Sequence, residues 1–110
     1  MSTYDDVMAA WRLIENPAHW CKGKARDGDR MCAEGAVFVA TEAGYFRGAA
    51  VLRALAMALP AGGRKVWLYN DAPGTMHADI RALFERAAAS VRPTRRRPRG
   101  RGAKTAARKK

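Results

Sequence analysis

The last 19 residues of the chain carry almost all of its excess positive charge, which restricts any hydrophobic core to the residues before them. Residues 92–110 contain ten cationic side chains and no Asp or Glu. Residues 1–91 therefore keep 11 of the 21 Lys and Arg against all 10 acidic residues, a net charge of +1. The cations of residues 92–110, the segment that we call the tail, are Arg92, Arg95, Arg96, Arg97, Arg99, Arg101, Lys104, Arg108, Lys109 and Lys110.

The tail lacks the side chains that a folded segment buries. It has no aromatic and no branched aliphatic residue, and four Pro or Gly residues, the first being Pro93, interrupt any helix. Ordering one residue costs about 1–2 kcal/mol, and without apolar burial nothing offsets that cost. We therefore predict a disordered basic tail at residues 92–110. A chain of 110 residues then has room for one small globular α-rich domain, at residues 1–91.

Two segments of this domain have the apolar spacing of a helix that buries one face. The first is expected to end near Asn16-Pro17, because the residue before a proline is excluded from helical conformation. Ser2 or Thr3 is a candidate cap for its start, and Thr75 is a candidate cap for the second helix. The apolar positions are Tyr4, Val7, Met8, Trp11 and Ile14 in the first segment and Ile80, Leu83, Phe84, Ala87 and Val91 in the second.

The residues between these helices are less regular. Residues 48–59 are rich in Ala and Leu and are followed by Pro60, which predicts a third helix. Residues 66–69, Val-Trp-Leu-Tyr, are bulky and β-favouring, and they predict a short strand or extended segment. Residues 36–41 form a short apolar run that fits either state.

Asp27-Gly28 is a pair of residues typical of the turn in a two-residue β hairpin. If strands flank it, Cys32 lies opposite Gly23, and Cys21 lies diagonally across on the same face. Such diagonal neighbours are about 7–8 Å apart, near the outer limit for a disulfide. We therefore expect the two thiols to lie close together, without a bond between them being implied.

Three stretches of the domain together resemble one known family. They are residues 19–23 (His-Trp-Cys-Lys-Gly) with 25–27 (Ala-Arg-Asp), residues 32–36 (Cys-Ala-Glu-Gly-Ala) and residues 69–75 (Tyr-Asn-Asp-Ala-Pro-Gly-Thr). In this order they resemble a family of small uncharacterised bacterial domains of unknown function, common in actinobacteria and their phages, and the resemblance spans residues 4–91. It implies that residues 32–41 are helical, so that the domain is mainly α, with about four helices and a short β hairpin or extended segment. It implies no activity.

Four residues could ligate a metal, but their spacing is not that of a structural zinc site. Such sites take ligands in pairs a few residues apart, whereas the two cysteines are eleven residues apart. We therefore predict no metal and no cofactor, and two buried thiols that pack as small apolar groups. The four residues are His19, Cys21, Cys32 and His77.

A nucleophilic thiol is the other chemistry that the residue types allow. Cys21 or Cys32 with His77 as base, oriented by Asn70 or Asp71, would supply the groups of a cysteine enzyme. No local signature supports that arrangement, and no glycine-rich phosphate loop is present. We therefore predict no catalytic residue, and a Cys/His enzyme is the least favoured hypothesis for the function.

The tail is the strongest functional feature, because its composition resembles the basic extensions of histone-like and ribosome-associated proteins. We predict a non-enzymatic protein that binds DNA or RNA phosphates without sequence preference through the ten tail cations. The alternative is a protein–protein interaction or regulatory module of phage or mobile-element origin, whose tail only aids solubility. Tyr45-Phe46-Arg47 is then a candidate contact with the partner, because aromatic residues and Arg are enriched at interfaces.

The start of the chain predicts its location. It is acidic and then amphipathic, without the basic start and apolar stretch of a secretory signal. The longest apolar run, residues 54–60, is far shorter than the ~20 residues that cross a bilayer. We therefore expect a cytoplasmic protein with reduced thiols and no membrane partner.

Overall fold

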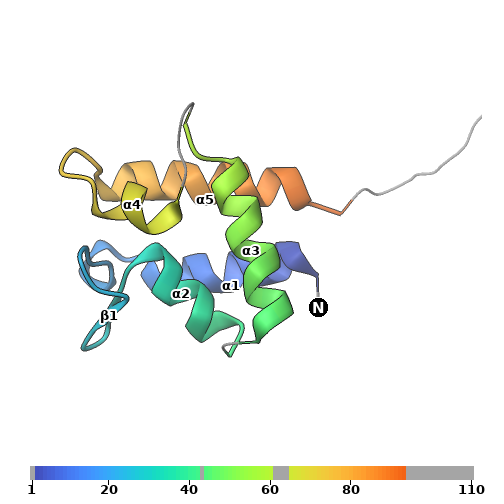
Figure 1. Ribbon diagram of the computed structural model, residues 1–110, viewed down its shortest axis with the longest axis horizontal. Coiled ribbons are helices and arrows are strands. Elements are labelled where there is room, and N and C mark those ends of the chain that lie inside the picture. The colour runs from blue at the N-terminus through green and yellow to red at the C-terminus, as the bar shows by residue number, and fades with distance from the viewer. Residues whose placement is uncertain (1, 43, 61–64, 94–110) are drawn as a thin grey trace, which may run out of the picture.

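The computed structural model describes residues 2–42, 44–60 and 65–93, which are mainly helical with one short hairpin (Figure 1). The sequence predicted this architecture with about four helices, and the described residues form five α-helices. In chain order the elements are α1 (Thr3–Ile14), a 3₁₀ turn η1 (Pro17–His19), β1 (Arg26–Asp27), β2 (Arg30–Met31), α2 (Ala33–Ala40), α3 (Tyr45–Met57), α4 (Val66–Asp71) and α5 (His77–Val91).

The first helix, α1, begins at a serine cap, as predicted. The hydroxyl oxygen of Ser2 accepts a hydrogen bond from the backbone N–H of Asp5 at 3.1 Å, and the Asp5 carboxylate accepts one from the backbone N–H of Ser2 at 3.2 Å. This capping box satisfies N–H groups that the start of a helix otherwise leaves without partners. The helix ends at Ile14, and Asn16, which precedes Pro17, is extended with ψ at 122°.

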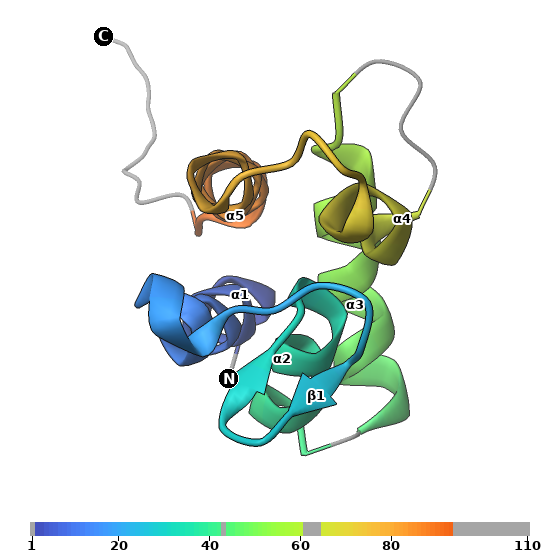
Figure 2. The same cartoon turned by 90° about the vertical axis from the view of Figure 1, so that its left-hand side faces the viewer.

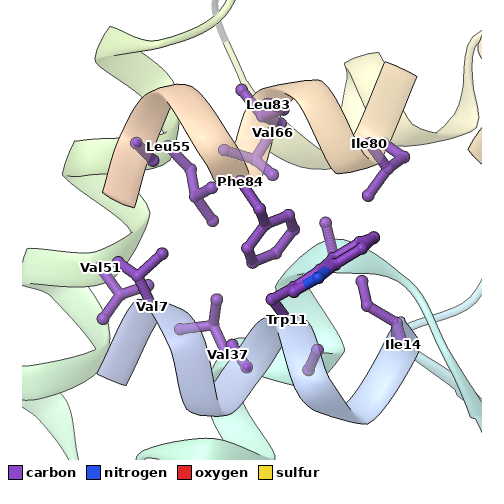
Figure 3. Packing of buried hydrophobic residues seen from close by; sticks show 14 of the residues in the cluster. Val7, Trp11, Ile14, Val37, Val51, Leu55, Val66, Ile80, Leu83 and Phe84 are labelled. Atoms are coloured by element: carbon purple, nitrogen blue, oxygen red, sulfur yellow. The ribbon is translucent and has the colours of Figure 1, made fainter. Parts of the chain in front are cut away.

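The core lies between α1 and α5, which run in opposite directions, and α2 and α3 cover its side (Figures 1 and 2). Trp11 of α1 and Phe84 of α5 meet at its centre, with ring centroids 5.4 Å apart (Figure 3). Seven of the ten apolar positions that predicted the two helices are buried in this core. The largest buried apolar residues are Val7, Trp11, Ile14, Met31, Val37, Val51, Leu55, Val66, Ile80, Leu83 and Phe84.

The two ends of this helical layer carry different features. The hairpin and α4 lie at one end, which we call the hairpin end (Figure 1). The start of α1 and the last turn of α5 lie together at the opposite end, which we call the tail end because residue 92 follows there. Among the described residues no helix has the length and apolar character needed to cross a bilayer, and α5, the longest, has 15 residues.

The strand predicted at residues 66–69 is wrong, because these residues form the first part of the helix α4. The backbone N–H of Tyr69 donates to the carbonyl of Lys65 at 3.1 Å, a helical i to i−4 bond. Val66 and Asn70 are buried while Trp67 and Leu68 are exposed, a helical spacing and not the alternation of a strand. A strand also needs a neighbour, and the sheet within the described ranges consists of β1 and β2.

The hairpin forms, but one residue further along the chain than predicted. Arg26 pairs with Met31 and Asp27 pairs with Arg30, so the turn residues are Gly28 and Asp29. Gly28 has φ at +67°, a conformation that glycine adopts without strain at the first turn position of a type II′ hairpin. The requirement for positive φ at that position therefore sets the register. In this register Cys32 is opposite Ala25 instead of Gly23.

The remaining predictions for the helices hold with shifted boundaries. Residues 32–41 are helical from Ala33 to Ala40, as the family resemblance implied, and α3 begins three residues before the predicted start and ends two residues early. Thr75 does not cap α5. Its hydroxyl donates instead to the carbonyl of Tyr69 at 2.7 Å, and the cap is Met76, whose backbone N–H donates to the Asp79 carboxylate at 2.8 Å.

Candidate functional site

Asn70 is the centre of a polar network at the hairpin end. Its side chain is fully buried, and its Oδ1 accepts hydrogen bonds from the indole Nε1 of Trp20 at 2.7 Å and from the backbone N–H of Ala33 at 3.1 Å. Its Nδ2 donates to the carbonyl of Cys21 at 3.1 Å. One side chain thus joins the segment after η1, the first turn of α2 and the end of α4, which are the three stretches that carry the family resemblance.

The residues around Asn70 extend this network to the surface. The carboxylate of Asp71 accepts hydrogen bonds from the backbone N–H of Gly23 at 2.8 Å and from Nδ2 of Asn70 at 2.9 Å. The ammonium group of Lys22 donates to the carbonyl of Ala72 at 2.7 Å and lies 5.8 Å from the centre of the Trp20 ring. The loop of residues 20–23 is therefore held against the end of α4 by both its backbone and its side chains.

A close approach of two backbones completes this end of the molecule. A Cβ atom at Gly35 would overlap with the carbonyl group of Ala25, whose carbon would be 2.8 Å away. This contact lets the backbone N–H of Cys32 donate to that carbonyl at 3.1 Å, so the start of α2 bonds directly to the segment before the hairpin. The glycine at position 35 is therefore required by packing, not by an unusual φ.

Both cysteines are free and buried next to this network. Cys32 is the cap of α2, and its Sγ accepts a hydrogen bond from the backbone N–H of Gly35 at 3.3 Å, whereas the Sγ of Cys21 donates to the carbonyl of Lys24 at 3.5 Å. Burial raises the pKa of both thiols, and for Cys32 the hydrogen bonds from Gly35 and Glu34 oppose that rise only in part. A negative charge on Cys32 would raise the pKa of Cys21 further. The backbone N–H of Cys21 donates to the carbonyl of Met31 at 3.0 Å, so Cys21 is bonded to the residue that precedes Cys32.

We expect both thiols to resist alkylation by iodoacetamide at pH 7 in the folded protein and to react at once in guanidinium chloride. The reason is that burial keeps them protonated, and the thiolate is the reacting form. The free energy of unfolding should also fall as the pH rises above the ordinary thiol value of 9.0, because unfolded thiols then lose protons that folded ones retain. Mass spectrometry of the alkylated protein measures the first effect. Rapid labelling of either residue without denaturant would contradict it.

The contacts found for His77 are with Ile14, Trp11 and Trp20 and with neither thiol. Its Nε2 is 2.8 Å from the carbonyl oxygen of Ile14, and its ring packs against Trp11 and Trp20 with centroids 5.5 and 5.7 Å away. It therefore joins the start of α5 to the end of α1. His19 is the last residue of η1, and the described ranges contain no group of three or more His, Cys, Asp or Glu residues placed to hold a metal ion.

A shallow pocket of about 360 Å³ lies beside the network at the hairpin end. Cys32 and Asp71 line it together with Glu34, Lys24 and Trp67. Cys32 and Asp71 thus line the same pocket, although Cys32 is only 4% exposed. The amide of Asn70, however, is used by Trp20, Ala33 and Cys21 and is not placed to orient His77.

At the tail end, Arg92 is the only predicted nucleic-acid-binding residue that falls within the described part of the chain. It follows the last residue of α5, Val91, with an extended backbone, and its guanidinium lies 5.9 Å from the centre of the Tyr4 ring. The other predicted residues, Arg95, Arg96, Arg97, Arg99, Arg101, Lys104, Arg108, Lys109 and Lys110, lie outside the described residues.

A groove of about 500 Å³ at the tail end was missed by the sequence analysis. It lies between α3 and α5, with Thr3 of α1 at its margin, and two of its lining residues are the arginines Arg53 and Arg86. Part of the signal was present in the sequence, because Ala50, Arg53 and Met57 recur at helical spacing on one face of α3. The facing residues of α5 could not be identified without knowing how the two helices pack.

Within the predicted partner contact, Tyr45-Phe46-Arg47, the structure gives Phe46 and Arg47 different surroundings. Phe46 is 83% exposed on α3, so it remains a candidate for contact with a partner. Arg47 binds the buried carboxylate of Asp6 with two hydrogen bonds, from Nε to Oδ2 at 3.2 Å and from Nη2 to Oδ1 at 2.8 Å. These bonds raise the pKa of Arg47, and they assign the guanidinium a structural role between α1 and α3.

Comparison with known proteins agrees with the family resemblance. No curated protein and no solved structure matches the chain significantly. One family model does match, described as a family of unknown function (DUF6197), and it covers residues 2–90. The match includes all three stretches that meet around Asn70 and stops before the tail. The chain therefore belongs to this family of unknown function, DUF6197.

Proposed function

We propose that this protein is a non-enzymatic nucleic-acid-associated protein that binds the phosphate backbone of DNA or RNA through its tail. The observation that carries the proposal is the separation of charge along the chain. Ten cations and no acidic residue occupy the last 19 positions, next to a domain whose net charge is +1. Phosphate is the common cellular group that such a cationic segment fits, and a cytoplasmic location would bring it into contact with both nucleic acids.

The mechanism is the release of counterions from the nucleic acid. Each phosphate that a Lys or Arg neutralises contributes about −0.9 to the slope of log affinity against log salt on duplex DNA, and about −0.7 on single strands. Contacts to phosphate carry no sequence information, so we expect no preference for a particular sequence. If about 6–10 tail cations engage, the affinity should fall roughly 10³–10⁵-fold between 50 and 200 mM salt.

The test replaces the nine cations after Arg92 by glutamine in the full-length chain. Arg92 is kept because its guanidinium packs over Tyr4. Binding to a 30-nucleotide single strand and to a duplex of the same length is measured by fluorescence anisotropy across a salt series. We expect the neutral tail to weaken binding to both probes at least 100-fold and to flatten the salt slope, as the loss of several phosphate contacts requires.

A matched variant changes every tail arginine to lysine, which preserves the charge and alters the geometry. It should retain most of the affinity, because a non-specific phosphate contact needs a positive charge and not the planar guanidinium group. A neutral tail that binds both probes as tightly as the wild-type tail would contradict the proposed function.

A second candidate function is a protein-interaction module. The observation that favours it is a set of exposed apolar side chains on α2 and α4, where Phe38, Val39, Trp67 and Leu68 are each 41–47% exposed. In that case the protein with the neutral tail would still bind its protein partner, and binding would be lost when Trp67 and Leu68 are made polar.

A further inference from the structure

The groove at the tail end has the composition of a site for a ligand that is partly apolar and partly anionic. More than half of its lining residues have small or apolar side chains, which we call the floor of the groove; they include Ala50, Ala54 and Met57 of α3 and Val91 of α5. Thr3 and Ser90 add hydroxyl groups at its margin. Its volume of about 500 Å³ is within the range of sites that hold small organic molecules, about 300–1,000 Å³.

Two arginines line this groove, one from α3 and one from α5. Arg53 is exposed on α3, and Arg86 is exposed on α5, where its Nε donates to the carbonyl of Ala58 at 2.9 Å. That bond uses one of the five N–H donors of the Arg86 group and fixes its position at the margin. None of the described residues that line the groove is acidic, so its charge complements an anion.

The groove is also continuous with the start of the tail. Val91 lines it and is followed by Arg92 and then by Pro93, the last described residue. The 17 residues after Pro93, even fully extended, reach at most about 60 Å. A polyanion bound by the tail is therefore held near this groove at a high effective concentration, so even a weak contact there adds to the affinity.

We propose that this groove binds one unpaired nucleotide of a nucleic-acid strand whose neighbouring phosphates are held by the tail. The inference rests on the proposed function and adds to it a preference for single strands over duplexes. Arg53 and Arg86 bind phosphates of the strand, and the base lies on the apolar floor beside Met57. In a duplex the bases are paired and stacked, and they cannot enter the groove without that stacking being broken. The protein should therefore prefer single strands to duplexes of equal length.

The test uses full-length protein, a 30-nucleotide oligothymidine strand and a 30-base-pair duplex, at salt concentrations from 50 to 200 mM. Arg53→Gln should weaken binding to the single strand roughly 3–10-fold and reduce the salt slope by about 0.7, the value for one lost phosphate contact. The matched control, Arg12→Gln, removes one exposed cation from the last turn of α1, about 13 Å along that helix from Thr3. It should leave the salt slope for the single strand nearly unchanged.

A second pair of variants tests the floor of the groove without changing charge. Ala50→Leu fills part of the groove and should remove the preference for the single strand while leaving duplex binding unchanged. Ala49→Leu, at an exposed position on the same helix that does not line the groove, should leave both affinities unchanged. Circular dichroism of all four variants confirms that each remains folded.

The outcomes separate the groove from the tail. Suppose that the neutral tail weakens binding, but that Arg53→Gln has the same affinity and salt slope for the single strand as Arg12→Gln, or that Ala50→Leu has the same affinity for it as Ala49→Leu. The tail proposal then stands and the groove proposal is overturned. Equal affinity of the wild-type protein for the single strand and the duplex would also overturn it. If the neutral tail binds as tightly as the wild-type tail, the proposed function itself has failed.

Discussion

Gly35→Ala is expected to destabilise the protein by about 4–5 kcal/mol or more, which is a large part of the roughly 5–15 kcal/mol typical of a folded domain. The added methyl group would overlap with the carbonyl of Ala25, and both groups belong to backbones that cannot rotate away. Relief of the overlap would move α2 away from the hairpin end. It would break the hydrogen bond from the backbone N–H of Cys32 to Ala25 and disturb the bond from Ala33 to Asn70.

Gly74→Ala provides the control for this prediction. Gly74 lies in the loop before α5, its φ is not positive, and a Cβ there would meet no atom within 4 Å. Its replacement should leave the stability within about 0.5 kcal/mol of the wild-type value. Urea denaturation followed by circular dichroism measures both variants. If Gly35→Ala unfolds at the same urea concentration as Gly74→Ala, the close approach at residue 35 is not required.

Asn70→Ala is expected to cost about 3–5 kcal/mol. It leaves the indole N–H of Trp20, the backbone N–H of Ala33 and the carbonyl of Cys21 without this partner, and each buried polar group left unsatisfied costs roughly 1–3 kcal/mol. The loss should release the hairpin end first, since Asn70 joins three segments there. Trp20 fluorescence should therefore shift to longer wavelength, and the thiols should become open to alkylation.

Asn16→Ala is the matched control, because the Asn16 side chain is exposed and accepts one hydrogen bond, from the backbone N–H of Ala18 at 2.9 Å. Its loss should cost about 0.5–2 kcal/mol, as for other caps. A double-mutant cycle of Asn70→Ala with Trp20→Phe should give a combined loss smaller than the sum, because the two variants remove the same hydrogen bond. Additive losses would show that the bond at 2.7 Å does not contribute to stability.

The elements that the sequence predicted well are those whose signal is local and long. The apolar positions of α1 and α5 repeat over three turns or more, and the serine cap and the Asn16-Pro17 stop are read from adjacent residues. The family resemblance supplied the helix at residues 33–40, where an apolar run without clear periodicity does not distinguish a helix from a strand.

The errors arose where tertiary contacts outweigh local preference. Val66, Trp67 and Tyr69 favour strands, but the sheet in the described part of the chain consists of β1 and β2, and α4 buries Val66 and Asn70 on one side. The hairpin is shifted because Gly28 takes the first turn position, and the preference for Asp27-Gly28 assumed that it takes the second. Thr75 does not cap α5 as predicted, because its hydroxyl donates a hydrogen bond to the carbonyl of Tyr69 in α4.

The candidate sites also differ in how much of each the sequence alone reveals. The tail can be identified from the sequence, because its charge is counted from the residue types without knowledge of the fold. The groove was missed because Arg53 and Arg86 are 33 residues apart and meet only when α3 packs on α5. The sequence offers Asn70 as a possible orienting residue for His77. Its bonds to Trp20, Ala33 and Cys21 could not be predicted, because these residues are 37 to 50 positions away from it in the sequence.

The position of Thr3 at the margin of the groove has a practical consequence for the design of affinity tags. A peptide fused in front of residue 1 would be joined two residues before Thr3, which lines the groove together with Arg53 and Arg86. Under the proposed function, an acidic epitope tag there would compete with nucleic acid for the guanidinium groups of the groove, and a polyhistidine tag would add cations of its own. Binding measurements therefore require protein whose amino-terminal fusion has been cleaved off.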